Sequence, residues 1–171
     1  LKFTALLLPL AIVVLLFQNY VYVFGNDNTE RLRKFYLEEE NSLDVVIVGA
    51  SETHCAYIPG YAYQQYGYTS YLYSIDGNIG SFYASQLEEI FSHQDPGLIL
   101  IEIGSLVRPE DPYEYEAKLR MFVEPIPPSH NKLNTIMNAD YDDKISCIFP
   151  FFKYHGDWEI ATINLARYCL Y

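Results

Sequence analysis

Short apolar runs alternate along the chain with segments of helical periodicity. Residues 44–48, 69–74 and 98–103 are rich in β-branched and aromatic side chains, which predicts three strands, the last of them buried on both faces. Helical spacing is found in segments 29–40, 59–66, 81–93, 130–139 and 158–170. This alternation with short links predicts an α/β domain whose parallel sheet lies between two layers of helices.

An apolar segment opens the chain. Residues 1–24 carry one charge, Lys2, are apolar or small up to Phe17, and end in aromatic residues suited to a membrane interface. A cleaved signal peptide would end in small residues, and a buried helix would carry polar residues on one face. We therefore predict a transmembrane anchor at 1–24 and a polar juxtamembrane segment at 25–43.

Proline and acidic residues crowd the segment 108–128, which follows the third predicted strand. Prolines interrupt the backbone hydrogen bonding of helices and strands, and acidic side chains favour solvent. We therefore expect an insertion or flap here, outside the core of the domain.

Charge and composition exclude two kinds of partner. The sequence has 11 Lys and Arg against 22 Asp and Glu, a formal net charge of −11. Its single dense basic group is Arg31, Arg33 and Lys34, too little to neutralise nucleic-acid phosphates. The three cysteines and four histidines show no metal-site spacing, so we predict neither a nucleic-acid partner nor a metal or other cofactor. The odd cysteine count argues against a disulfide framework and leaves one bridge open.

Ser51 directly follows the first predicted strand, after Gly49 and Ala50. A serine there lies at the carboxyl end of a strand, where α/β sheets bind ligands, and near helix N–H groups that stabilise developing negative charge. The alternative is that Ser51 caps the following turn, which is a far commoner role for serine. The residues taken alone favour capping.

Three sequence blocks carry a family resemblance: the strand leading into Gly-Ala-Ser51, the segment 71–78 before a helix, and the strand at 98–104. In these the chain resembles the SGNH hydrolase superfamily, and within it the membrane-anchored envelope branch that includes lipoteichoic-acid D-alanylation and polysaccharide O-acetylation proteins. The resemblance covers about residues 1–160. It implies a three-layer, flavodoxin-like fold.

The same resemblance assigns roles to individual residues. It implies Ser51 as the nucleophile and the backbone N–H of Gly77 as an oxyanion donor, with Asn78 as a second oxyanion-binding residue. The segment 149–158, with its Lys-Tyr-His core, also resembles this branch, which makes His155 a candidate substrate-binding residue.

The function implied is a serine-dependent esterase or acyltransferase. Its substrate would be an acyl group on a cell-envelope polysaccharide or an acyl carrier, and other envelope-assembly proteins would be partners. The protein would cross the cell membrane once, with its domain on the extracytoplasmic side. The basic residues that follow the anchor favour the opposite side by the positive-inside rule; we follow the resemblance.

Two features depart from the family pattern. The third block normally offers an asparagine to the oxyanion, and here it reads Gly104-Ser105. The sequence contains no Asp-x-x-His, the family's source of the general base, without which a serine hydroxyl is a poor nucleophile. Three explanations follow: 44–171 is a partial, truncated domain, or the base lies elsewhere, or the protein is inactive. We favour truncation. The rival interpretation is a non-catalytic membrane-anchored scaffold or glycan-binding protein.

Other ionisable residues fit the site less well. We expect His54 to be an exposed turn residue that does not reach back to Ser51, and the histidines other than His155 to serve structure. Acidic side chains near strand ends could serve a glycosidase in pairs, an alternative we rank lower. They are Glu52, Asp76 and Glu102.

Overall fold

The computed structural model describes residues 9, 10, 12, 13, 27–154 and 156. Contacts divide the chain into two compact units, one of residues 27–141 and one of the two terminal segments. Among the described residues no helix combines the length and apolar character needed to cross a membrane. Most of the predicted anchor at 1–24, and all of the helix predicted at 158–170, lie outside the described residues.

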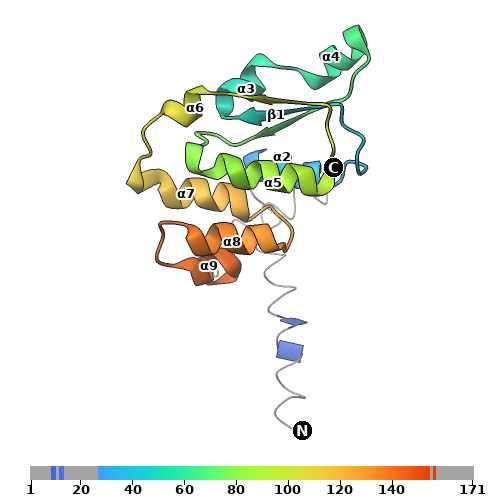
Figure 1. Ribbon diagram of the computed structural model, residues 1–171. Coiled ribbons are helices and arrows are strands. Elements are labelled where there is room, and N and C mark those ends of the chain that lie inside the picture. The colour runs from blue at the N-terminus through green and yellow to red at the C-terminus, as the bar shows by residue number, and fades with distance from the viewer. Residues whose placement is uncertain (1–8, 11, 14–26, 155, 157–171) are drawn as a thin grey trace. The chain divides into compact units, whose positions relative to one another are not determined.

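A parallel sheet organises the 27–141 unit (Figure 1). It consists of β1 (Val45–Gly49), β2 (Ser70–Ser74) and β3 (Leu98–Ile101) in the order β2-β1-β3. The register places Gly49 opposite Ser74, so the carboxyl ends of β1 and β2 meet at one edge. The predicted α/β class with a parallel sheet is confirmed, and the strand order is compatible with a flavodoxin-like fold.

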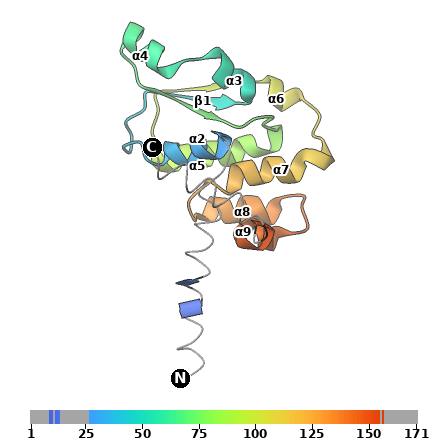
Figure 2. The same ribbon diagram turned by 180° about the vertical axis from the view of Figure 1, so that it is seen from behind.

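Helices cover both faces of this sheet. In the two opposite views α2 and α5 lie on one face, and α3 and α4 lie on the other (Figures 1 and 2). The helices of the unit are α2 (Asp27–Phe35), α3 (Ser51–Ala56), α4 (Pro59–Tyr66), α5 (Tyr83–His93), α6 (Gly104–Val107), α7 (Pro112–Val123) and α8 (His130–Asn138). Helix α4 has the predicted bounds, whereas the short helix α3 was not predicted.

Helix α2 belongs to the core of the unit. It contacts β2 and α7, and Leu32 and Phe35 are completely buried. The Phe35 ring meets the Tyr73 ring edge-on, with 4.9 Å between centroids. Part of the segment 25–43, expected as a juxtamembrane link, therefore supplies core residues. The helix also ends earlier than the prediction of 29–40, at Phe35.

The prediction of a flap at 108–128 is wrong, because most of the segment forms helix α7, whose apolar residues are in the core. Asp111 caps α7 by accepting a hydrogen bond from the Tyr113 N–H at 2.9 Å, and Pro112 occupies the first turn, where proline is tolerated. Apolar residues then recur at helical spacing and are buried: Leu119, Phe122, Val123 and Ile126.

Strand β3 is not buried on both faces, contrary to the prediction. Leu98 is 49% exposed and Leu100 is 45% exposed, whereas Val46 and Val48 of β1 are fully buried. The cause is position, since β1 is the central strand and β3 pairs with β1 alone among the described residues. An edge strand with this composition is unusual, because apolar edges favour association.

The terminal unit contributes two short helices to the described residues. They are α9 (Lys144–Ile148), capped by the Asp143 carboxylate, and α10 (Phe151–Tyr154). The candidate substrate-binding residue His155 lies outside the described residues.

Candidate functional site

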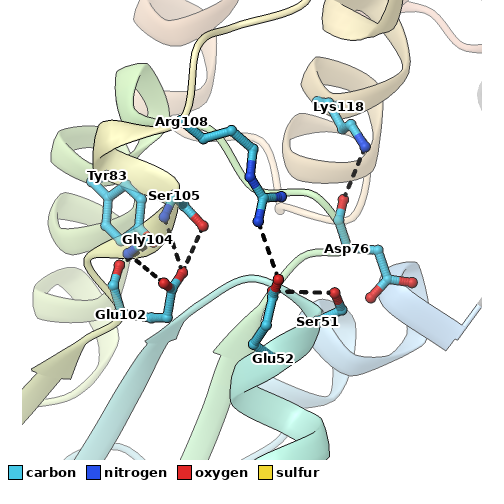
Figure 3. A network of polar contacts seen from close by, with 9 residues as sticks. All are labelled: Ser51, Glu52, Asp76, Tyr83, Glu102, Gly104, Ser105, Arg108 and Lys118. Atoms are coloured by element: carbon cyan, nitrogen blue, oxygen red, sulfur yellow. Dashed lines mark hydrogen bonds and ion pairs between the residues drawn. The ribbon is translucent and has the colours of Figure 1, made fainter.

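The loops that follow the three strands meet at the carboxyl edge of the sheet, and Figure 3 shows their polar side chains. Ser51 and Asp76 each lie two residues beyond a paired position, because Gly49 and Ser74 are opposite one another. The carbonyl of Gly49 also accepts the N–H of Ile75 at 3.1 Å. The first and second sequence blocks are therefore neighbours, as a site at this edge requires.

Ser51 is the first residue of α3 and is half-buried. The N-cap position belongs to Ala50, and no side chain caps this helix, so the alternative role of Ser51 as a cap is wrong. Its hydroxyl donates to the Glu52 carboxylate at 3.3 Å. Gly49 precedes this turn because a Cβ there would overlap Thr53 and lie 2.6 Å from the Glu102 Cβ.

Glu52 is paired with a cation above the strand ends. Arg108, just beyond α6, places its guanidinium 3.1 Å from the Glu52 carboxylate, and both side chains are more than half exposed. Hydrogen bonding to its own backbone N–H, followed by the Arg108 contact, holds the Glu52 pKa below its usual value. Glu52 is therefore a carboxylate at neutral pH and a weak proton acceptor.

Gly77 occupies a turn whose backbone conformation favours glycine. Its φ is +61°, and the Lys118 side chain lies where a Cβ would be. The Lys118 ammonium, on α7, is 3.4 Å from the Asp76 carbonyl and 3.3 Å from the Glu114 carboxylate. Among the described residues no hydrogen bond engages the Gly77 N–H.

Asn78 is fully buried, and its side chain is used inside the fold. Its amide donates to the Gly49 carbonyl at 3.2 Å and to Gln86 Oε1 at 3.0 Å. Its carbonyl oxygen accepts from the Ile79 N–H and from Gln86 Nε2. The Asn78 backbone N–H donates to the Ile75 carbonyl. These bonds hold the β2 loop against β1, and they leave no Asn78 donor directed to an oxyanion.

Glu102, in the third sequence block, forms hydrogen bonds with the turn that follows it. Its carboxylate accepts the N–H groups of Gly104 and Ser105, and the buried Ser105 hydroxyl donates to it at 2.6 Å. The Tyr83 hydroxyl donates to the Glu102 carbonyl at 2.9 Å (Figure 3). The Gly104-Ser105 turn is thus bound to the Glu102 carboxylate and presents no side-chain amide.

His54 is not an exposed turn residue, contrary to the prediction. It lies on α3 with its side chain 20% exposed, and its Nε2 is 3.4 Å from the Asp76 carboxylate. Its Nδ1 is 3.2 Å from the buried hydroxyl of Ser74, which also accepts from Arg31 at 3.3 Å. Both ring nitrogens have partners, so His54 serves this cluster. No spacing in the sequence predicted the cluster, because its members come from α2, α3, β2 and the turn after β2.

The arrangement offers the half-buried hydroxyl of Ser51, a backbone N–H at Gly77 and the cations of Arg108 and Lys118 at the carboxyl ends of the strands. That combination suits acyl chemistry on a polar substrate, provided that a base reaches Ser51. Three carboxylates were weighed for a glycosidase. Glu52 is paired with Arg108, Asp76 lies 3.4 Å from His54 Nε2, and Glu102 bonds its own loop. Among the described residues no cluster of histidine, cysteine or acidic side chains could hold a metal ion.

Comparison of the chain with protein-family models, with curated proteins and with solved structures finds no match.

Proposed function

We propose that this chain is an SGNH-type esterase or acyltransferase with Ser51 as its nucleophile. The observation that carries the proposal is the position of Ser51, half-buried at the first residue of α3, directly beyond the carboxyl end of the central strand. The substrate would be an acyl ester on a cell-envelope polysaccharide. The proposal includes a membrane anchor at 1–24 and an extracytoplasmic domain.

In the proposed step the Ser51 oxygen attacks the acyl carbonyl carbon, and a base takes the hydroxyl proton. The N–H groups of Ser51 and Gly77 hold the oxyanion, and the alcohol of the substrate leaves as the acyl-enzyme forms. Asn78 has no part in this step because its donors are used inside the fold. The base comes from outside the contacts described above.

A second candidate is a non-catalytic, membrane-anchored scaffold or glycan-binding protein. The specific observation in its favour is the engagement of the groups nearest Ser51. Glu52 has a lowered pKa, and His54 is bound by Ser74 and Asp76. A serine without an adjacent base is not activated.

Labelling with a fluorophosphonate, with and without added imidazole, separates the two candidates. The serine oxygen displaces fluoride from phosphorus, and imidazole supplies the missing proton acceptor. We expect slow labelling of the full chain, a rate that rises with imidazole concentration, and an adduct that peptide mass spectrometry places on Ser51. Ser51→Ala should remove this adduct and change the free energy of unfolding by less than about 1 kcal/mol.

Exposed Ser81 is the internal control, because it lies on the connection from β2 to α5 and not on the loop that follows β1. Adduct formation at Ser81 equal to that at Ser51 would mean that Ser51 has no special reactivity. So would equal labelling of Ser51→Ala and the parent chain. Either result would favour the non-catalytic candidate.

A further inference from the structure

Helix α4 and its flanks present a surface of tyrosines, which we call the tyrosine face. On α4 itself Tyr61 and Tyr63 are each 59% exposed and Tyr66 is 74% exposed. Tyr57 and Tyr68, on either side of the helix, are half-buried. Large exposed aromatic groups gathered on one element mark an interaction site more often than scattered ones do.

The tyrosine face is held in place from within. Pro59 opens α4, Gly67 closes it with a φ of +79°, and Ala62 is buried where α4 contacts β2. The rings of Tyr66 and Tyr68 stack 6.1 Å apart at 15°. The Tyr57 hydroxyl lies 3.2 Å from that of Tyr68 and donates to Ser70 at 2.9 Å. These contacts already restrict the rings, so the binding of a ligand loses less side-chain entropy.

The chain segment that carries the tyrosine face contains no formally charged residue. The chain has 11 basic and 22 acidic residues, yet none falls between His54 and Asp76. The Asp44 carboxylate, which accepts the Thr69 N–H at 2.8 Å, lies next to this segment, but the segment itself offers a ligand no counter-ion. The exposed polar groups are phenols and the amides of Gln64 and Gln65, which are neutral donors and acceptors.

The chemistry of these side chains points to one class of occupant. A lipid surface is bound by aliphatic residues together with basic ones, and here Ile58 is the one exposed aliphatic residue of segment 57–68. A docked helix needs an aliphatic groove. Phenol rings and amides instead match the flat C–H faces and hydroxyl edges of sugars, because tyrosine combines an apolar ring with a polar tip.

We propose that the tyrosine face binds a neutral glycan chain. Sugar rings stack on Tyr63 and Tyr66, which lie on one side of α4 three residues apart, and the glutamine amides bond their hydroxyls. Helix α4 follows α3 in the chain and lies on the same face of the sheet (Figure 1). The inference does not depend on Ser51 being a nucleophile.

Affinity gel electrophoresis of the full chain, in a detergent without a sugar headgroup, tests the proposal. The probes are a soluble neutral β-glucan and its carboxymethylated derivative, which adds only negative charge. We expect the neutral polymer to retard the chain and the anionic polymer to retard it less. Tyr63→Ala combined with Tyr66→Ala should weaken retardation about tenfold, which corresponds to about 1.4 kcal/mol.

Two controls accompany the double variant. Tyr113, 97% exposed on α7, lies outside the tyrosine face, so Tyr113→Ala should leave retardation unchanged. Tyr63→Phe with Tyr66→Phe keeps the rings and should retain most of the binding. Circular dichroism checks that each variant folds.

Several results would overturn the proposal. They are the absence of retardation by the neutral glucan, retardation that survives the double alanine variant, and equal weakening by Tyr113→Ala. Binding to phosphatidylcholine vesicles, or self-association, that the double variant abolishes while glucan retardation is absent would assign the face to a lipid or to a second copy instead.

Discussion

Replacing Asn78 by alanine should destabilise the fold, because the structure makes this residue a clamp between the first two strands. Its side chain takes part in hydrogen bonds with the Gly49 carbonyl, the Ile79 N–H and both ends of the Gln86 amide. Gly49 keeps a second donor, the Ile75 N–H. The Ile79 N–H and the two Gln86 groups would lose the partners described here.

The magnitude follows from those three buried groups. Each costs roughly 1 kcal/mol or more when it is left without a partner, so Asn78→Ala should lower the free energy of unfolding by about 3 kcal/mol. For a unit of this size that is a fall in Tm of about 12 °C. Asn78→Leu combined with Gln86→Leu leaves only the Ile79 N–H unpaired and should cost about 1 kcal/mol, less than the single alanine variant.

Urea denaturation followed by circular dichroism measures these differences, and Ser51→Ala serves as the matched surface control. If Asn78→Ala unfolds at the same urea concentration as the parent, the Asn78 side chain does not clamp the two strands. If such a stable Asn78→Ala variant also lost fluorophosphonate labelling at Ser51, Asn78 would again be a candidate oxyanion donor. The double leucine variant separates lost hydrogen bonds from lost packing volume.

Two further predictions concern the core. Phe122→Ala on α7 should lower the free energy of unfolding, measured by urea denaturation, by about 4 kcal/mol, because the side chain is fully buried against Phe82. The control Tyr113→Ala, at an exposed position of α7, should lower it by less than about 0.5 kcal/mol. Equal small effects would mean that α7 is a flap and not part of the core. Burial raises the pKa of Tyr73, so its contribution to stability is present below pH 10 and is lost as the unfolded chain ionises above it. Between pH 8 and pH 11 the free energy of unfolding of the parent should therefore fall by about 1.4 kcal/mol more than that of Tyr73→Phe. An equal fall in both proteins would contradict the raised pKa of Tyr73.

The sequence predicted those elements whose local pattern and tertiary role agree. Residues 44–48 and 69–74 form strands within one residue of the prediction, because β-branched and aromatic residues there also lie in the sheet. Helix α4 has both of its boundary residues in place, Pro59 at the start and Gly67 at the end. Helix-boundary residues of this kind act locally, so they can be recognised without knowledge of the rest of the fold.

The failures have equally physical causes. Prolines around α7 suggested a loop, although Asp111-Pro112 is a helix start and the spacing of Leu119, Phe122 and Val123 is helical. Strand β3 has the composition of a buried strand, and only its position in the sheet exposes it. The His54 cluster joins residues from three elements, and no spacing in the sequence brings those elements together.

Internal bonds occupy most polar groups at the carboxyl edge of the sheet, which limits what this edge can do without help. Asn78 and Glu102 hold their own loops, and His54 is held by Ser74 and Asp76. The Ser51 hydroxyl contacts Glu52, whose lowered pKa lets it orient the hydroxyl without removing its proton. Reaction at Ser51 therefore depends on a base brought to it, whereas glycan binding at the tyrosine face needs none. The two proposals can consequently fail separately: glucan retardation without imidazole-dependent labelling would leave a glycan-binding protein, and labelling without retardation would leave a serine esterase or acyltransferase that recognises its substrate elsewhere.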